Sequence, residues 1–313
     1  MNKILNFHYV NNGVWFEQAV CYLKSRYEFI STENLYEFYQ GRVSLKNSCH
    51  ITIDDGDKSF YDVIFPILKK HRVPASIYVS PKICIEKSNY WFQEINGYNQ
   101  LELKRIIADM TNIPLDFLIK FNTESILKTM QIIQIHEIIK RYREKTHTPA
   151  KSFQNMSVSN LKEVNHSGLV TVGAHTLNHP ILKNEDDVTS EYEINGSVNE
   201  LSSLLNCEVK YFTFPNGIPG LDFSEREKNY LKKSSIQLAF TTASKNISSS
   251  DDTMCIPRFS ISDSENLSFF KTKLFAGSIW DTLTRLKPAG EYRERQKLIR
   301  IFTQLFRLKA EDY

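Results

Sequence analysis

The sequence predicts an α/β fold in which the main strands run parallel. Short apolar runs with strand character alternate along the chain with segments whose apolar residues recur three or four positions apart. About seven strands can be counted, and this alternation is typical of βα units. Three of the strands also end in unusual polar or turn residues. In α/β barrels the carboxyl ends of the strands are where the chemistry is placed.

The predicted strands are short and apolar, and they lie at residues 4–10, 49–53, 74–79, 169–174, 209–214, 238–242 and 256–261. The predicted helices between them lie at residues 15–27, 35–39, 60–71, 157–168, 191–205 and 223–235. Ser157 or Ser159 is expected to begin one of these helices, and Gly168 is expected to end it.

The pattern changes between about residues 84 and 151, where strands stop and helices at 101–110 and 125–143 are expected. We interpret this stretch as a helical insertion between strands, not as an independent domain. Insertions at a strand's carboxyl end often build substrate walls. We therefore expect one domain over residues 1–275, which includes the insertion.

Residues 276–313 are predicted to form a basic helical tail, with a helix from about 291 to 309. Its apolar residues share one face, and they are Leu298, Ile301, Phe302, Leu305 and Phe306. Two interpretations stay open. The helix docks on the rest of the protein, or it makes a peripheral membrane contact.

The composition excludes several classes of protein. The net charge of +3 is nearly balanced and gives no reason to expect a nucleic-acid partner. The five cysteines show no CxxC spacing, so neither a disulfide framework nor a cysteine-only metal site is indicated. The sequence shows no secretory signal and no stretch of ~18 apolar residues. We expect a cytoplasmic location, with the inner face of the membrane as an option.

Three strand ends carry the candidate chemistry. Residues 51–53 lead into the adjacent carboxylates Asp54 and Asp55, which repel each other in a half-buried place and are poor for stability. The strand at 169–174 leads into His175 and His179, and two histidines four positions apart can bind one ion. Taken alone, a helix cap for the carboxylates and packing for the histidines remain alternatives.

Taken together, three segments resemble the motifs of one family. They are Thr-Ile-Asp-Asp-Gly at residues 52–56, His-Thr-Leu-Asn-His-Pro at 175–180 and Pro-Asn-Gly at 215–217. In this order and spacing they resemble the polysaccharide deacetylase (NodB-homology, carbohydrate esterase family 4) superfamily, over roughly residues 3–261. The resemblance implies a distorted (β/α)7 barrel. It also implies a metal-dependent hydrolase of linear amides that removes an N-acetyl group from an amino sugar or saccharide in surface polysaccharide biosynthesis or modification.

The resemblance assigns roles to single residues. Asp55, His175 and His179 are carried over as ligands of a divalent ion, with zinc as the first choice. Asp54 is carried over as the general base, since the metal neutralises its neighbour and leaves this carboxylate free to accept a proton. The backbone N–H of Asn216 is expected to stabilise the oxyanion.

Other expected site residues contact the substrate. Pro215 is expected to line the acyl group. Many members of the family carry an arginine at the position of Thr213. Arg258 on the last strand is expected to enter the site and contact substrate, with a salt-bridging or surface role as the alternative. Trp91 is expected to hold the sugar ring, with packing as the alternative.

The general acid is left open. The family commonly takes it from a histidine near the last strand, but residues 256–261 contain none. Asp54 could return the proton that it accepts. His8, just after the first strand, is the other candidate because an imidazole titrates near neutral pH. The alternative for His8 is a buried structural histidine.

Two other functions remain possible on the sequence alone. The first is a catalytically inactive saccharide-binding protein of the same fold, which the arginine missing at position 213 favours. The second is a hydrolase of another C–N bond, such as a formyl-sugar deformylase or a small cyclic amide hydrolase. An assay of acetate release from a panel of N-acyl sugars separates these possibilities.

Overall fold

The computed structural model describes residues 1–276 and 290–311, with side chains described as far as residue 302. The chain divides into two compact units. The first, which we call the sheet unit, comprises Met1–Ser88 and Phe153–Asp281. The second, which we call the helical unit, comprises Asn89–Ser152 and Thr282–Tyr313.

The sheet unit is built on one parallel sheet in the strand order β7-β6-β5-β4-β3-β1-β8, with β2 paired to β3 off this path. The strands are β1 (Lys3–Phe7), β2 (Glu28–Phe29), β3 (Ser48–Ile53), β4 (Ala75–Val79), β5 (Val170–Ala174), β6 (Tyr211–Thr213), β7 (Leu238–Phe240) and β8 (Phe259–Ser260). Each predicted strand corresponds to an observed one. Only the two-residue β2 was missed, because it is too short to show a period.

The sheet curls until its two edges meet. The backbone N–H of Thr241, just after β7, donates to the carbonyl of Ile256 at 2.8 Å, and Phe240 forms a parallel bridge with Ile256. A few residues later β8 pairs with β1, with Leu5 opposite Phe259. The predicted distorted (β/α)7 barrel is therefore confirmed as a curled parallel sheet of seven strands with surrounding helices.

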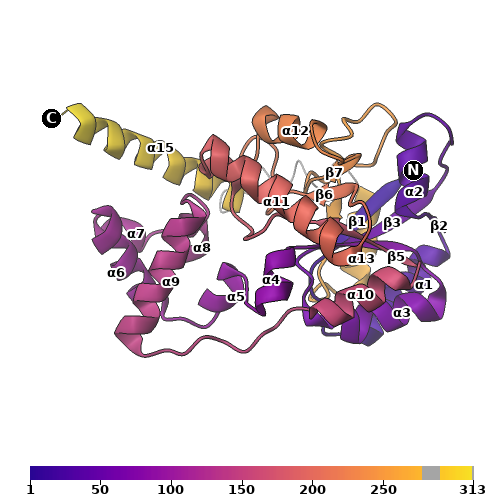
Figure 1. The fold of residues 1–313 in the computed structure, drawn as a ribbon, viewed down its shortest axis with the longest axis horizontal. Helices are drawn as coiled ribbons and strands as arrows, with labels where there is room; N and C mark the ends of the chain where they lie inside the picture. The colour runs from indigo at the N-terminus through magenta and orange to yellow at the C-terminus, as the bar shows by residue number, and fades with distance from the viewer. Residues whose placement is uncertain (277–289, 312–313) are drawn as a thin grey trace. The chain divides into compact units, whose positions relative to one another are not determined.

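Helices surround the strands of the sheet unit (Figure 1). They are α1 (Gly13–Lys24), α2 (Thr32–Tyr39), the π-helix η1 (Phe60–Ile64) continued by α3 (Phe65–His71), α4 (Pro81–Glu86), α10 (Val158–His166), the 3-10 helix η2 (Leu182–Asn184), α11 (Asp187–Leu205), α12 (Glu225–Lys232) and α13 (Leu267–Ala276). Every residue of β1, β3 and β4 is buried. Strands covered on both faces read as continuous apolar runs, which is why the sequence shows them clearly.

Two apolar clusters occupy the two faces of the sheet. Leu5, Ile51 and Ile77 belong to the larger cluster, which also contains residues of the outer helices. Ile4 and Tyr78 belong to the other cluster. Neighbouring residues of one strand point to opposite faces, so β1 and β4 supply both clusters.

The helical unit contains α5 (Trp91–Ile95), α6 (Gln100–Thr111), α7 (Leu115–Leu118), α8 (Thr123–Leu127), α9 (Ile132–Thr146) and α15 (Glu291–Glu311). The predicted helix at 125–143 is two helices, because α8 ends at Leu127 and Gln131 begins α9 with a capping box. The apolar faces of these helices pack into a core of their own.

The C-terminal helix packs within the helical unit. The carboxylate of Glu294 accepts hydrogen bonds from the backbone N–H of Asn122 and the hydroxyl of Ser125, both at 2.7 Å. Lys128 pairs with Glu291 at 2.9 Å. The structure thus groups the tail with the insertion. Whether residues 1–275 and 276–313 fold independently of each other stays a prediction.

The burial of this helix bears on the predicted membrane contact. Leu298 and Phe302 belong to the buried core of the helical unit. These two side chains are therefore not available to lipid, and a membrane contact through the rest of the helix stays a prediction. Over the described part of the chain, no helix is long and apolar enough to cross a membrane.

A buried polar chain crosses the sheet unit at His50 in β3. The ring Nδ1 of His50 lies 2.8 Å from the carbonyl oxygen of Ile30, and Nε2 lies 2.7 Å from the hydroxyl of Ser76. That hydroxyl lies 2.6 Å from the hydroxyl of Thr32. Burial lowers the pKa of His50 to about 4, so the ring is neutral near pH 7.

This burial predicts how stability depends on pH. In the unfolded chain the pKa of His50 returns to about 6.5, so the unfolded state binds more protons between pH 6.5 and pH 4. The contribution of the neutral ring to stability is present above pH 6.5 and is lost as the pH falls towards 4. The loss is at most ~1.4 kcal/mol per pH unit.

We expect His50→Gln to flatten the fall of the unfolding free energy between pH 7 and pH 4.5, as measured by urea denaturation. His166→Gln, at an exposed histidine, is the control and should leave the slope unchanged. Equal slopes for His50→Gln and the unchanged protein would contradict the prediction.

Candidate active site

Three neighbouring parts of the sheet bring the candidate residues to one end of the barrel. Asp54 and Asp55 follow β3, His175 follows β5, and Asn216 lies just after β6. The register places Val79 opposite Ala174, and Ala174 opposite Phe212. Because these strands are parallel, the side chains at their carboxyl ends meet at one edge.

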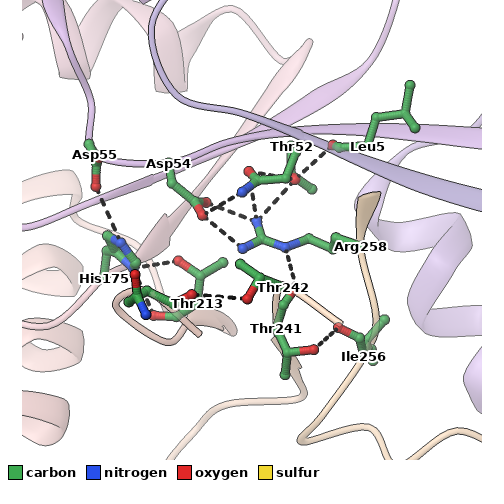
Figure 2. Close-up of polar contacts among 12 residues, drawn as sticks. Leu5, Thr52, Asp54, Asp55, His175, Thr213, Thr241, Thr242, Ile256 and Arg258 are labelled. Atoms are coloured by element: carbon green, nitrogen blue, oxygen red, sulfur yellow. Dashed lines mark hydrogen bonds and ion pairs between the residues drawn. The ribbon is translucent and has the colours of Figure 1, made fainter. Parts of the chain in front are cut away.

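Asp55, His175 and His179 form a buried group that could hold a metal ion. Their ligand atoms all lie within 4.8 Å of one another. Oδ1 of Asp55 is 3.4 Å from Nε2 of His175 and 3.5 Å from Nε2 of His179. Figure 2 shows the carboxylate of Asp55 facing the His175 ring. The expected ligand atoms are therefore brought together.

The hydrogen bond of His175 suits metal binding. Its Nδ1 lies 2.8 Å from the backbone carbonyl of Thr213 and 2.5 Å from the Thr213 hydroxyl (Figure 2). A carbonyl only accepts, so Nδ1 carries a proton. Nε2 faces Asp55, to which it donates when protonated, and it offers its lone pair to an ion once that proton is lost. Such bonds behind a ligand orient metal-binding histidines. Two imidazoles and a carboxylate form a donor set that fits zinc.

The charge state of Asp55 also suits a ligand. Burial by itself would raise the pKa of Asp55, but a hydrogen bond with His175 and the positive charges of His179 and His8 outweigh burial. The net effect holds the pKa of Asp55 well below its usual range. Asp55 is therefore an anion at any pH at which the protein is expected to work.

Left-handed backbone conformations are concentrated in the three motifs. Asp55, Thr176, His179 and Asn216 have φ values of 73°, 61°, 57° and 57°. Each such non-glycine residue costs ~1–3 kcal/mol and persists only where the surroundings enforce it. The fold therefore holds these turns in a conformation that the free chain would leave.

Arg258, which precedes β8, forms a buried ion pair with Asp54. Nη1 and Nη2 of Arg258 lie 2.9 Å and 2.7 Å from the two carboxylate oxygens of Asp54 (Figure 2). The same guanidinium donates to Asn6, Thr52 and the carbonyl of Thr241. Burial would raise the pKa of Asp54, but the charge and hydrogen bonds of Arg258 lower it overall.

This geometry corrects the role that we expected for Arg258. The side chain is fully buried at 0% exposure, and its donors are directed at protein groups, so it does not contact substrate. Its two Nη atoms bind Asp54 instead, which is the salt-bridging role that the sequence left as the alternative. The sequence shows a single arginine in a largely apolar predicted strand, which marks Arg258 as unusual. It does not show that Asp54 is the partner.

The loop after β6 is held by a residue that the sequence did not reveal. Oδ2 of Asp222 accepts from the Asn216 side-chain amide at 2.6 Å and from the backbone N–H of Ile218 at 2.7 Å. Thr242 donates its hydroxyl to the carbonyl of Asn216 at 3.0 Å. Within the described residues, no hydrogen bond uses the backbone N–H of Asn216. This N–H is therefore available to a ligand, as the oxyanion role requires.

The other predicted residues have separate outcomes. His8 is exposed, which contradicts the alternative of a buried structural histidine. It lies close enough to Asp54 and Asp55 for its charge to act on both. Trp91 is 2% exposed in the core of the helical unit, so its expected contact with a sugar is wrong and its packing role is confirmed. Pro215 is buried beside Asn216.

The sequence comparison agrees with this site. The polysaccharide deacetylase profile matches residues 42–239, which is more than half of the chain and includes all three motifs. The chain belongs to the polysaccharide deacetylase family. Its members are hydrolases that act on saccharides. No curated protein matches the sequence.

Solved structures show that the deacetylase fold extends over most of the chain. IcaB from Ammonifex degensii is 18% identical with a TM-score of 0.58, covering 88% of this chain and 96% of its own. PplD from Streptococcus pyogenes, in complex with acetate, is 18% identical with a TM-score of 0.55, covering 83% and 91%. A de-N-acetylase from Aggregatibacter actinomycetemcomitans is 15% identical with a TM-score of 0.57, covering 87% and 99%.

The buried ion pair of this deacetylase predicts a double-mutant result. Arg258→Met leaves Asp54 as an uncompensated buried charge and should lower the free energy of unfolding by ~3–5 kcal/mol. Adding Asp54→Asn removes that charge and should restore part of the loss. Urea denaturation of both variants measures the effect.

Arg42→Met is the control, since Arg42 forms an exposed pair with Glu37 and such pairs contribute ~0–1 kcal/mol. The interpretation is wrong if Arg258→Met costs no more than Arg42→Met. It is also wrong if the double variant is no more stable than Arg258→Met.

Proposed function

We propose that this deacetylase uses a divalent metal ion, with zinc as the first choice, to remove an N-acetyl group from an amino sugar or saccharide. The observation that carries the proposal is the buried group of Asp55, His175 and His179 with Asp54 next to it in sequence. The structure of the deacetylase PplD in complex with acetate supports this chemistry, because acetate is a product of N-acetyl hydrolysis.

The chain's own residues divide the work around the ion. A divalent ion held by Asp55, His175 and His179 would supply Lewis-acid chemistry, polarising the acyl oxygen and easing deprotonation of the attacking water. Asp54 accepts that proton. Arg258 keeps Asp54 ionised and fixed in position. The backbone N–H of Asn216 donates to the oxygen on which negative charge develops.

The leaving amine needs a proton from a general acid placed near the ligand candidates. His8 is exposed at the carboxyl end of β1, and its charge acts on both carboxylates. We assign it the role of general acid. Pro215 is assigned to the wall around the acyl group. The expected cytoplasmic location and the role in surface polysaccharide biosynthesis stay predictions.

The structure weakens the case for an inactive saccharide-binding protein. That alternative depended on the missing arginine at Thr213, and Arg258 supplies an arginine to Asp54. A binding protein has no need of a buried, ionised Asp54 beside three metal-ligand candidates. Hydrolysis of another C–N bond remains the second function, and measuring acetate and formate release from one panel of N-acyl sugars decides between the two.

Substitutions of Asp54 and His175 should have different effects on activity and metal content. Asp54→Asn is expected to abolish acetate release while keeping bound metal, because the base is lost and the ligands remain. His175→Ala is expected to lose the metal. Elemental analysis and an acetate assay on both variants measure this. Full activity with equal metal content in both variants would contradict the roles of Asp54 as base and His175 as ligand.

His8 should affect turnover without affecting the metal. His8→Ala is expected to lower kcat by ~10²-fold or more, the size typical of a lost positioned acid. Metal content and the free energy of unfolding should stay unchanged. His166→Ala, at an exposed histidine that precedes β5, is the control. Near-normal kcat in His8→Ala would leave Asp54 to act as both base and acid.

A further inference from the structure

A buried carboxylate outside the three motifs reaches the turn between the two histidines. Glu193 lies in α11 and is 2% exposed. Its Oε2 accepts the backbone N–H groups of Leu177 and Asn178, both at 2.9 Å. Its Oε1 accepts the side-chain amide of Asn178 at 2.5 Å. Three donors from two consecutive residues of the turn therefore converge on one side chain.

The same helix is shaped to approach the turn closely. A Cβ placed on Gly196, three residues after Glu193, would lie 2.7 Å from Cδ1 of Leu177, which real Cβ atoms essentially never do. A side chain at this position would therefore force the end of the Leu177 side chain to shift. The helix that carries Glu193 thus contacts the turn at a second position.

The turn contains backbone conformations that need support from the surrounding structure. Thr176 and His179 both have left-handed backbones. Thr176 accepts the backbone N–H of His179 at 3.0 Å through its hydroxyl. Without Glu193, the N–H groups of Leu177 and Asn178 would lose their acceptor in a largely buried place, and relaxation of the turn would move His179 relative to His175.

A carboxylate is an expensive group to bury for packing alone. Burial raises the pKa of Glu193, and this effect outweighs the hydrogen bonds from Asn178 and Leu177 and the charge of Lys82, which lower it. No ion pair to Glu193 is found in the part of the chain that the structure describes. The three donors that Glu193 binds offset part of the cost of burying its carboxylate.

We propose that Glu193 is a positioning residue that holds residues 175–179 in the conformation that places both histidines for metal binding. The inference rests on the proposed function, because it takes His175 and His179 as ligands. Glu193 itself is not a ligand, since its carboxylate is occupied by Leu177 and Asn178.

The test is the affinity of the full-length, metal-free protein for Zn²⁺, titrated against a competing chelator. Glu193→Ala is expected to raise the Kd for Zn²⁺ by tenfold or more, within the 10–100-fold loss typical of groups that orient metal ligands. Glu193→Gln should raise the Kd less, by ~threefold, because rotation of the Asn178 amide restores uncharged hydrogen bonds. Glu191→Ala, on the exposed side of the same helix, should leave the Kd unchanged.

A purely structural role gives a different result. It would lower the unfolding free energy of the metal-free protein while leaving the Kd of the folded protein within twofold of the unchanged one, and that outcome overturns the proposal. Should Glu193→Ala fail to fold, Glu193→Gln carries the test, and an unchanged Kd there overturns it too. Failure of the unchanged protein to bind Zn²⁺ would overturn the metal site itself, whereas normal binding by Glu193→Ala removes only Glu193.

Discussion

Two adjacent carboxylates buried at the end of β3 impose the main physical constraint on this structure. Asp54 and Asp55 would repel each other and lose hydration if nothing compensated them. The fold compensates each one separately. Arg258 binds both oxygens of Asp54, and the imidazoles of His175 and His179 face Asp55. The two carboxylates can therefore hold different roles although they are neighbours in the chain.

The turns that carry the other site residues are held from outside by further carboxylates. Glu193 binds the turn between His175 and His179, and Asp222 binds the loop that carries Asn216. Both segments contain residues with left-handed backbones, and this conformation persists only with such support. A carboxylate can accept several backbone N–H groups at once, which suits it to fixing an irregular turn. Rigid support of this kind is what a site needs for its reacting groups to stay aligned.

The sheet unit and the helical unit divide the chain by packing, and all the residues in the proposed mechanism lie in one of them. Every residue assigned to the candidate chemistry belongs to the sheet unit. The helical unit uses its apolar residues, Trp91 and Leu298 included, to build its own core. The chain shares its fold with deacetylases that are only 15–18% identical to it. A helical insertion is compatible with that fold, because loops between barrel strands tolerate insertions.

The sequence by itself determined the class of fold, the positions of the main strands along the chain and the residues of the three motifs. These features are local, since strand and helix periods and short motifs depend on residues close together in the chain. Only the tertiary structure decided that Arg258 belongs to Asp54, because the pair is separated by 204 positions and no local pattern joins them. The same holds for Glu193, which lies fifteen or sixteen positions from the turn that it supports. The burial of Trp91 and the exposure of His8 were also decided by long-range packing, which sets the environment of a side chain after the local elements have formed.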